Sequence, residues 1–337
     1  MSESMNKGKL LPMLFILGRG RSGSTLLKTM LDAHPQICIP GESRFLQYMY
    51  YHFRKAGNSG DKVRKAFMEA LPASFEAPPF DMEGLRQRLE NLPAEAGFRE
   101  MIQAAYLSIP SVFPKSNIRL IGDKNPRYVF FATVIARLFP SARFIHVIRD
   151  CRDSTLSFMK VKGMESEKKN AAFLACRWNI YNRQVERLSD RFPERFLRIR
   201  YEDLVMDPET ILRNICSFAG LDFDPAMLNY HQKVNELMEG ENAVYRDIHQ
   251  GLLQTVNADK CGIWKTKMTA RDQKATHAIA GRMLKSYGYE VPPGGEGSGK
   301  TLLYLPQRWQ ASVPLYAKKV LYRIPWLMRT FYAIKKR

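Results

Sequence analysis

One stretch near the N-terminus constrains the fold of this chain more than any other. An apolar run over residues 10–17 ends at Gly18, a glycine-rich turn follows, and apolar residues then recur at helical spacing over residues 26–31. This pattern predicts a buried strand, a tight loop and a helix, an order that points backbone N–H groups and a helix N-terminus at a bound anion. An ordinary glycine turn before a helix is the alternative interpretation.

The spacing of the glycines indicates which kind of anion this loop could bind. Gly18, four further residues and Gly23 match the start of a Walker A loop, but Ser24 stands where the lysine is needed. The loop carries Arg19 and Arg21 instead. A loop with arginines and without that lysine suits an anion other than a magnesium-bound γ-phosphate.

The length and the mean hydropathy of the chain limit the number of domains it can form. The chain has 337 residues, of which 45% are apolar, and a mean hydropathy of −0.32, which fits one large α/β domain with insertions or one domain with an appendage. No apolar run reaches the roughly 18 residues that span a bilayer, and residues 10–17 are too short for a signal peptide and lack a cleavage site. We therefore expect a cytoplasmic protein.

The charge balance indicates anionic partners. Lysine and arginine number 52 against 33 aspartate and glutamate, a net charge of +19, so nucleotides, nucleic acids, acidic substrates and membrane surfaces all come into question. The cysteines are odd in number, scattered and without CxxC spacing, so we expect neither zinc nor a disulfide framework, and a reducing compartment is the simplest setting. They are Cys38, Cys151, Cys176, Cys216 and Cys261.

Strands and helices are predicted to alternate along the chain. After the strand over residues 10–17, a short apolar piece lies at 37–39, strands are expected at 118–121, 143–149 and 196–201, and helices at 45–53, 128–139, 168–188, 208–218 and 269–287. Such alternation predicts a parallel sheet with right-handed crossovers. We expect an α/β fold of the P-loop type with three layers, in which helices cover both faces of a central parallel sheet.

Two regions fall outside this alternation. Residues 45–108 are expected to form a helical insertion that shapes a substrate pocket together with the loop-rich segment 223–260. A proline- and glycine-rich linker begins at Pro292. We therefore divide the chain into a domain over residues 1–292 and a linker with a C-terminal segment over residues 293–337.

Three anion-binding features are expected at one edge of the sheet. The loop at Gly18, Lys124 and Arg149 each follow the end of a predicted strand. In parallel sheets, ligands bind beyond the carboxyl ends of the strands. These features are therefore expected to converge on one ligand.

A second glycine-rich stretch matches the Walker A pattern literally. Residues 294–301 have the sequence GGEGSGKT. A P-loop needs an apolar strand before it and a helix after it, whereas here Pro292-Pro293 precedes and Pro306 soon follows. A flexible linker is the better interpretation.

The C-terminal segment is basic and aromatic. From Gly297 to Arg337 there are nine lysines and arginines and no acidic residue, interleaved with apolar and aromatic side chains. Residues 308–337 are typical of a segment that lies on an anionic membrane surface, which would make the protein peripheral at the inner membrane. A helix packed on the domain with a solvated basic face is the alternative, and nucleic-acid binding is not expected because no recognised module accompanies the charge.

The motifs together resemble a known family. They are Gly20-Arg21-Ser22-Gly23-Ser24-Thr25-Leu26-Leu27, the Gly122–Pro126 turn (GDKNP), and the strand, turn and helix that run from Phe144 to Ser157. In this order they resemble the sulfotransferase family, whose members use 3′-phosphoadenosine 5′-phosphosulfate (PAPS). The likeness is greatest to tyrosylprotein sulfotransferases, through Arg21 to Leu26, Leu31 to Pro35 and Gly41-Glu42, and it covers roughly residues 11–290.

The resemblance implies how the donor nucleotide is held. The first loop would bind the 5′-phosphosulfate, with charge from Arg21 and hydrogen bonds from the backbone and hydroxyls of residues 22–25. Arg149 and Ser157 would hold the 3′-phosphate. Tyr201 matches a position near the nucleotide, although it also fits a strand-end aromatic. The implied nucleotide-binding residues are Arg19, Gly20, Arg21, Ser22, Gly23, Ser24, Thr25, Arg149, Ser157 and Tyr201.

The resemblance also implies the chemistry. A sulfuryl group would pass in line to an acceptor hydroxyl on a carbohydrate, lipid, phenol or peptidyl tyrosine, with Arg21 and Lys124 stabilising the leaving phosphate. Glu42 stands at the family position of the catalytic base; otherwise it fits a carboxylate in the first turn of a helix. His34 and His146 are rival bases, both with structural interpretations. No metal is expected.

Some positions depart from the tyrosylprotein enzymes. Alignment through Trp264 puts Ile263 where those enzymes have a lysine, with Lys260 and Lys265 nearby. Two other functions stay open beside a PAPS-dependent sulfotransferase. One is a P-loop nucleotide kinase, and the other is a non-enzymatic, membrane-associated nucleotide-binding protein.

Overall fold

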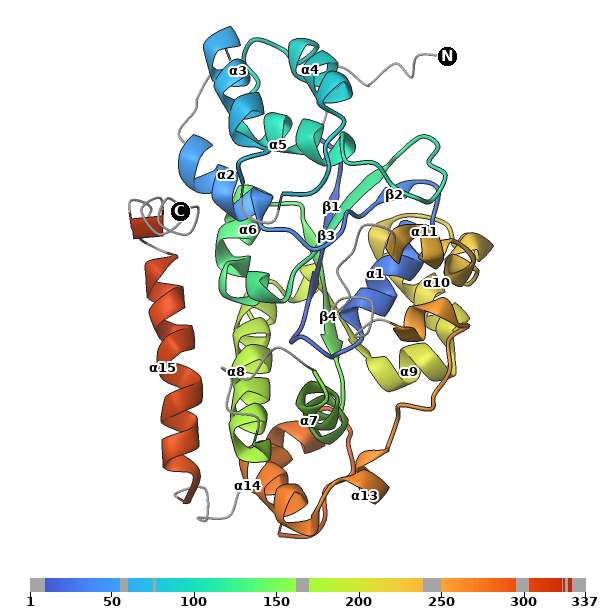
Figure 1. Ribbon diagram of the computed structural model, residues 1–337, viewed down its shortest axis with the longest axis vertical. Coiled ribbons are helices and arrows are strands. Elements are labelled where there is room, and N and C mark those ends of the chain that lie inside the picture. The colour runs from blue at the N-terminus through green and yellow to red at the C-terminus, as the bar shows by residue number, and fades with distance from the viewer. Residues whose placement is uncertain are drawn as a thin grey trace.

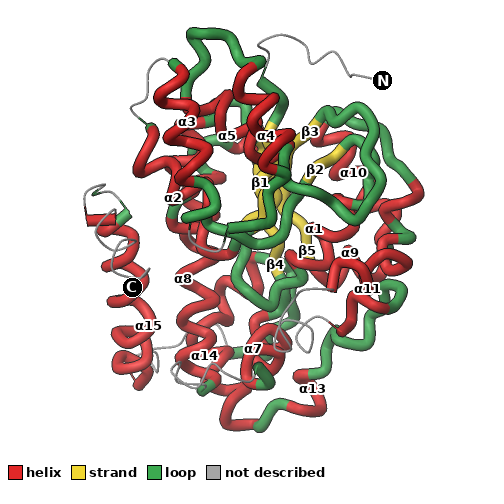
Figure 2. The backbone as a smooth tube through the Cα atoms, turned by 45° about the horizontal axis from the view of Figure 1, so that its top comes forward, coloured by secondary structure: helices red, strands yellow, loops and turns green. Residues whose placement is uncertain are grey.

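The protein is described here by a computed structural model that covers residues 10–54, 60–74, 77–161, 170–238, 250–294, 303–322, 324 and 327–328. Its described residues contain a five-stranded sheet with the order β2-β3-β1-β4-β5 (Figures 1 and 2). The strands are β1 (Met13–Leu17), β2 (Ile37–Cys38), β3 (Leu120–Lys124), β4 (Arg143–Ile148) and β5 (Phe196–Arg200). All four strand pairs are parallel, which confirms the predicted sheet.

Helices connect the strands and pack around the sheet. The α-helices are α1 (Ser24–Asp32), α2 (Phe45–Phe53), α3 (Asp61–Ala70), α4 (Met82–Glu90), α5 (Phe98–Leu107), α6 (Ala132–Leu138), α7 (Cys151–Met159), α8 (Ala171–Ser189), α9 (Tyr201–Met206), α10 (Pro208–Ala219), α11 (Val234–Met238), α13 (Trp264–Lys267), α14 (Ala270–Ser286) and α15 (Leu305–Leu321). The 3₁₀ helices are η1 (Pro126–Phe130), η2 (Pro193–Arg195), η3 (Pro225–Met227), η4 (Tyr230–Lys233) and η5 (Gln250–Leu253).

Both faces of the central strand are buried, as the continuous apolar run predicts. Successive side chains of a strand point to opposite faces. Met13, Phe15 and Leu17 accordingly pack in one hydrophobic cluster, and Leu14 and Ile16 pack in another. Figure 1 shows α6 and α8 on one side of the sheet and α1 and α10 on the other, which confirms the three-layer α/β architecture.

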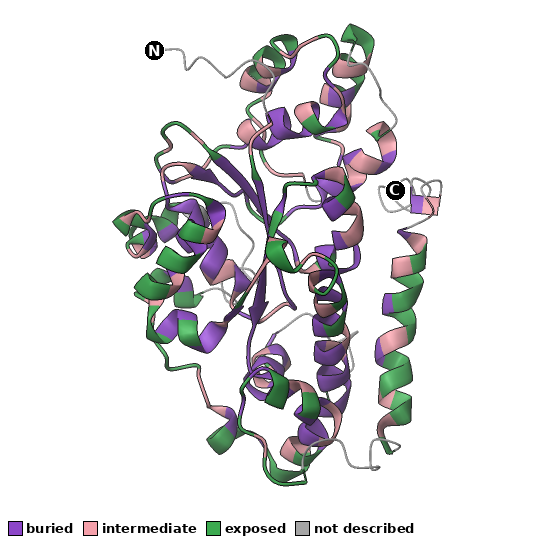
Figure 3. Cartoon of the chain, turned by 180° about the vertical axis from the view of Figure 1, so that it is seen from behind, coloured by how far each residue is buried: buried purple, intermediate pink, exposed green. Residues whose placement is uncertain are grey.

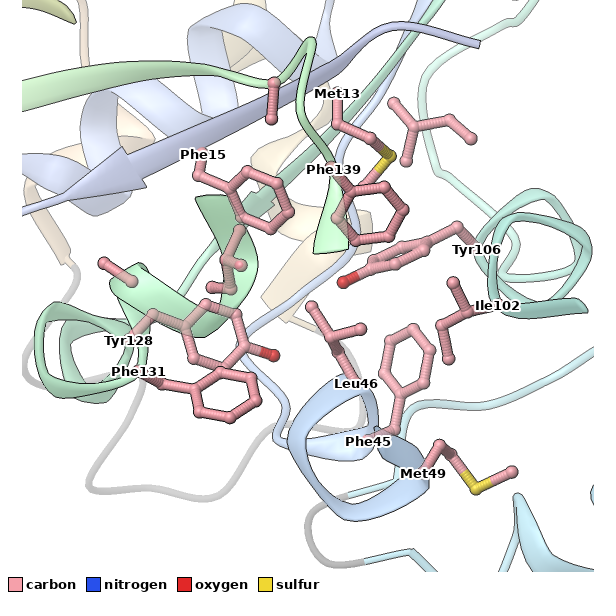
Figure 4. Close-up of a cluster of buried hydrophobic side chains, with 14 of the residues drawn as sticks. Met13, Phe15, Phe45, Leu46, Met49, Ile102, Tyr106, Tyr128, Phe131 and Phe139 are labelled. Atoms are coloured by element: carbon pink, nitrogen blue, oxygen red, sulfur yellow. The ribbon is translucent and has the colours of Figure 1, made fainter. Parts of the chain in front are cut away.

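The region expected to be a helical insertion forms α2, α3, α4 and α5. Helix α2 has the predicted bounds, and its Phe45 and Leu46 pack into the cluster beneath β1 (Figure 4). Tyr106 of α5 enters the same cluster, and its ring centroid lies 4.6 Å from that of Phe45. The insertion is therefore fixed to the sheet by buried aromatic contacts.

Local structure differs from the prediction in three places. The strand expected at 118–121 is β3 at Leu120–Lys124, so the first three residues of the expected Gly122–Pro126 turn belong to the strand. The helix expected over 128–139 is divided into η1 and α6, and Pro126 occupies the first turn of η1. Tyr201, expected at the end of a strand, is the first residue of α9. By contrast, the predicted cap of α14 is confirmed, because the hydroxyl of Thr269 accepts a hydrogen bond from the N–H of Asp272 at 3.2 Å.

Helix α15 lies alongside α8 at the edge of the molecule (Figure 1). None of the helices that the structure describes is both long enough and apolar enough to cross a bilayer. The glycine-rich stretch at 294–301 lies almost entirely outside the described residues, as do residues 329–337. The division of the chain at residue 293 stays a prediction.

Candidate functional site

The first loop forms a helix N-terminus that is open to an anion. Gly23 caps α1 with a positive φ of 87°, and Arg21 also has a positive φ, 71°. The N–H of Ser22 donates to the carbonyl oxygen of Arg19 at 3.3 Å. The first backbone hydrogen bond of the helix runs from the N–H of Leu27 to the carbonyl oxygen of Gly23 at 3.1 Å. The N–H groups of the first turn of α1 come before this bond and have no carbonyl partner within the helix, so they are available to an anion.

The ring of Tyr201 packs directly on this loop. A Cβ atom placed on Gly23 would lie 2.2 Å from Cδ2 of Tyr201. Only glycine combines the left-handed backbone with room for this ring. The tyrosine that the resemblance placed near the nucleotide therefore covers the anion-binding turn.

We expect Gly23→Ala to lower the free energy of unfolding by about 1–3 kcal/mol, because the substitution strains the backbone and displaces the Tyr201 ring. Urea unfolding measures the change. Gly60→Ala is the matched control, since a Cβ there meets nothing within 4 Å. Equal stabilities of the two variants would contradict the packing described here.

Arg21 joins the loop to α7. Its Nε donates a hydrogen bond to Oγ of Ser157 at 3.1 Å. Burial, and after it the positive charge of Arg149, lower the pKa of Arg21 to about 10, while the charges of Tyr201 and Glu42 oppose the shift. Two arginines thus share a partly desolvated space, an arrangement that an anion would stabilise.

Arg149 ends β4 beside the same loop. Its guanidinium lies 4.5 Å from the centroid of the Tyr201 ring, and its Nη2 donates to the carbonyl oxygen of Lys260 at 2.6 Å. Its Nε and the Oγ of Ser22 are buried and have no hydrogen-bond partner among the described residues. Buried polar groups are normally satisfied, so these two donors indicate a ligand with acceptor oxygens.

The structure brings Lys260 to the two arginines. Partial burial lowers the pKa of Lys260, and so do the nearby charges of Arg21 and Arg149. Lys260 lies more than one hundred residues from either arginine along the chain, and the sequence alone singled it out only as one of two lysines near Ile263, which stands where the tyrosylprotein enzymes have a lysine. The positive charge of Lys260 therefore adds to the charges of the two arginines.

The segment that carries Lys260 is held by α7. The carboxylate of Asp153 accepts hydrogen bonds from the N–H groups of Gly262 at 2.6 Å and Trp264 at 2.8 Å. The guanidinium of Arg152 lies 3.5 Å from the centroid of the Trp264 ring. The aspartate is not predicted by the sequence; the charged run that follows β4 is the only signal for it.

A second group of residues meets at the first turn of α1. The Nζ of Lys124, at the end of β3, donates to Oγ1 of Thr25 at 2.8 Å and forms an ion pair with Glu42. Burial lowers the pKa of Lys124, and the charge of Glu42 opposes this shift. The Glu42 side chain remains 36% exposed. A carboxylate that an acceptor can reach therefore lies beside a buried lysine and the first turn of α1.

Asp123 lies next to Lys124 but inside the core. Burial raises the pKa of Asp123 to about 7, although hydrogen bonds from the hydroxyls of Tyr106 and Tyr128 oppose the shift. The folded protein therefore binds a proton at this carboxyl more tightly than the unfolded chain does. This contribution to stability is complete below about pH 4 and is lost as the pH rises through about 7.

We expect Asp123→Asn to remove the loss of stability at rising pH, because the amide stays neutral while its oxygen still accepts a hydrogen bond from a tyrosine hydroxyl. Relative to the unsubstituted protein, the variant gains on the order of 1–3 kcal/mol between pH 5 and pH 8. Urea unfolding at both pH values measures it, with the exposed Asp190→Asn as control. Parallel pH dependences for Asp123→Asn and the unsubstituted protein would contradict the assignment.

The other residues that the sequence singled out, Arg19, His34 and His146, have side-chain contacts of their own. Arg19 is buried, with its guanidinium 4.8 Å from the Phe158 ring on α7. The His34 ring accepts the N–H of Gln36 at 3.0 Å and contacts a carbonyl at 2.9 Å. His146 is buried in β4 against Asn182 at 2.9 Å. Neither histidine is hydrogen-bonded to the groups around Arg21, which agrees with their structural interpretation.

Among the described residues, no three His, Cys, Asp or Glu side chains are grouped so that they could hold a metal ion.

The sequence is similar to those of known sulfotransferases. Protein-tyrosine sulfotransferase 1 of Danio rerio is 24% identical over 286 residues, which cover 84% of this chain and 73% of that protein. The protein-tyrosine sulfotransferase of Drosophila melanogaster is 23% identical over 305 residues, or 89% of this chain and 55% of that protein. This chain therefore spans only part of the length of each relative.

Solved structures show the same fold. The sulfotransferase domain of the olefin synthase of Synechococcus PCC 7002 superposes with a TM-score of 0.56 and 25% identity, covering 87% of this chain and all of that domain (100%). The sulfotransferase domain of the curacin biosynthetic pathway gives a TM-score of 0.56 at 24% identity, with 85% and 100% coverage.

The profile of the sulfotransferase family matches residues 12–225. That range is more than half of the chain, and it contains the first loop, Glu42, Lys124, Arg149 and Ser157. The match confirms the resemblance on which the sequence-based expectation rested. The chain belongs to the sulfotransferase family of enzymes.

Proposed function

We propose that this enzyme transfers a sulfuryl group from PAPS to an acceptor hydroxyl. One observation carries the proposal: Arg21 interacts with two groups of residues. Its Nε donates to Ser157 and the charge of Arg149 lowers its pKa, while the charge of Glu42, which pairs with Lys124, opposes that shift. A site with cations and a helix N-terminus for a phosphorylated donor, and with a carboxylate beside a lysine for an acceptor that loses a proton, suits transfer from a nucleotide with two anionic ends.

The residues of the site fit this donor. The N-terminus of α1 and Arg21 would hold the 5′-phosphosulfate, and the free donor groups of Ser22 and Arg149 would be satisfied by phosphate oxygens. Arg149 and Ser157 would hold the 3′-phosphate, and Lys260 joins them in this proposal. The ring of Tyr201 contacts both the loop and Arg149, so it would fix the distance between the two cradles.

The proposed chemistry needs little covalent participation by the protein. The acceptor oxygen forms a bond to sulfur while the bond from sulfur to the bridging phosphate oxygen breaks, and adenosine 3′,5′-bisphosphate leaves. Lys124 and Arg21 stabilise the charge that grows on the leaving phosphate. Glu42 takes the proton of the acceptor hydroxyl, and the product is a sulfate ester.

The relatives named protein-tyrosine sulfotransferases support peptidyl tyrosine as one acceptor to test first. Carbohydrate, lipid and small phenolic hydroxyls remain in the proposal. We also propose a cytoplasmic location, which is supported by the unpaired state of all five cysteines.

The proposal is tested with sulfur-35-labelled PAPS and a panel of tyrosine peptides, phenols, sugars and lipids. We expect label to pass to at least one hydroxyl class without added metal. Parallel reactions contain γ-labelled ATP with magnesium, which a nucleotide kinase would use. Transfer from ATP in the absence of transfer from PAPS would overturn the proposal.

A further inference from the structure

Helix α15 has one face packed on the domain. Ala311 and Leu315 are buried against the core, and Leu315 joins the same hydrophobic cluster as β1. Just beyond the helix, the carbonyl oxygen of Tyr322 accepts a hydrogen bond from the hydroxyl of Tyr51 at 2.6 Å. The Nζ of Lys319 donates to the side-chain oxygen of Gln184 on α8. These contacts fix the rotation of the helix about its axis.

The opposite face of α15 is apolar and exposed. The side chains of Trp309, Val313, Tyr316 and Val320 are 70%, 51%, 41% and 57% exposed. Their spacing of four, three and four residues places them in one row on a helix. We call these four residues the outer stripe. Figure 3 shows this helix as largely exposed along its length, in contrast to α8 beside it.

Such exposure is unusual within this protein. Six of the eight most exposed large apolar side chains in the described part of the chain lie within residues 303–320, and only Met206 and Leu253 lie elsewhere. Apolar residues scattered singly over a surface need no explanation, whereas a contiguous row indicates a partner.

The charge of the C-terminal segment identifies the partner. Arg308 is exposed near the edge of the outer stripe by its helical spacing, Lys318 is exposed on the other side of the helix, and residues 297–337 hold nine lysines and arginines without an acidic residue. A second copy packed on the stripe would bring only cations together, with no carboxylate on either helix to pair with them. Nucleic acid would require the outward face itself to be basic, but that face is apolar.

We propose that the outer stripe of α15 docks on the surface of an anionic lipid bilayer. The apolar row would enter the boundary between headgroups and acyl chains, where tryptophan and tyrosine are favoured. Arg308, at the edge of the stripe, would reach the anionic headgroups, and the net positive charge of residues 297–337 would attract the segment to them. The helix would lie flat on the membrane, because its other face stays packed on α8.

The full-length protein is tested by co-sedimentation with vesicles of phosphatidylcholine and phosphatidylglycerol, and with vesicles of phosphatidylcholine alone. We expect at least tenfold stronger binding to the anionic vesicles, and a decrease as salt is raised. Trp309→Ser with Val313→Ser should weaken that binding at least tenfold. The control changes two other exposed residues of the same helix, Gln310→Ala with Ala317→Ser, and should bind like the unsubstituted protein.

Circular dichroism and adenosine 3′,5′-bisphosphate binding show that each variant is folded, and neither depends on the membrane. Equal binding to both vesicle types, or equal binding of the two double variants, would overturn the proposal. So would concentration-dependent self-association in solution that only Trp309→Ser with Val313→Ser abolishes, because a second copy would then cover the stripe.

Discussion

Glu42→Gln is expected to lower kcat by about 10²–10⁴-fold, the range for loss of a general base. The carboxylate is part of a side chain that is 36% exposed, it pairs with the buried Lys124, and its charge opposes the lowering of the Arg21 pKa. Glutamine keeps the shape but takes no proton from the acceptor. Steady-state kinetics with PAPS and the best acceptor measure the loss.

The affinity of Glu42→Gln for adenosine 3′,5′-bisphosphate should stay within about threefold of the unsubstituted enzyme, because a base acts on the acceptor and not on the nucleotide. Glu83→Gln is the matched control, since its carboxylate is exposed on α4 in an ion pair with Arg86. If Glu42→Gln keeps full turnover, Glu42 is not the base.

Lys124→Ala is expected to lower kcat by about 10²–10³-fold, with a smaller effect on the KM for PAPS. Removing a charge that acts on a developing negative charge in a desolvated site costs catalysis on this scale. Lys124 is 2% exposed and bonded to Thr25 on the first turn of α1, so its ammonium lies where the leaving phosphate is expected.

The control for this prediction is Lys233→Ala. Lys233 also has a glutamate partner, at 2.8 Å, but on an exposed helical turn far along the chain. A change in KM alone for Lys124→Ala, with kcat unaffected, would show that the lysine only binds the nucleotide and would contradict its proposed role in transfer.

Much of the fold follows from the sequence because its signals are local. A two-sided apolar run gives β1, apolar spacing gives α2 with its bounds, and a threonine with an aspartate three residues later gives the start of α14. The convergence of Gly18, Lys124 and Arg149 follows from the geometry of parallel sheets. These expectations needed no knowledge of side-chain packing.

The rest of the site depends on contacts between distant segments. Lys260 reaches the arginines only because Asp153 holds the N–H groups of residues 262 and 264, and neither spacing nor periodicity reports such a bond. The contact of Tyr201 with Gly23 likewise arises from tertiary packing across 178 residues of chain. The sequence also gave no sign that Asp123 would be buried against two tyrosines.

The placement of the C-terminal segment also depends on contacts between distant parts of the chain. Its composition predicts a basic, aromatic surface helix, but the sequence left open whether this helix packs on the domain or binds a membrane. The structure shows that one face of α15 packs on the domain and that the face carrying Trp309 and Val313 is turned outward. Which apolar residues stay exposed was decided by the position of α8.

An enzyme that uses PAPS as proposed here needs a separate site for the 3′-phosphate. Titration calorimetry compares adenosine 3′,5′-bisphosphate with adenosine 5′-monophosphate, which lacks only that phosphate. We expect the bisphosphate to bind at least about 100-fold more tightly, as charge-assisted bonds to Arg149 and its neighbours imply, and Arg149→Ala to remove most of the difference. Equal affinities for the two nucleotides, or an undiminished difference in Arg149→Ala, would contradict the account.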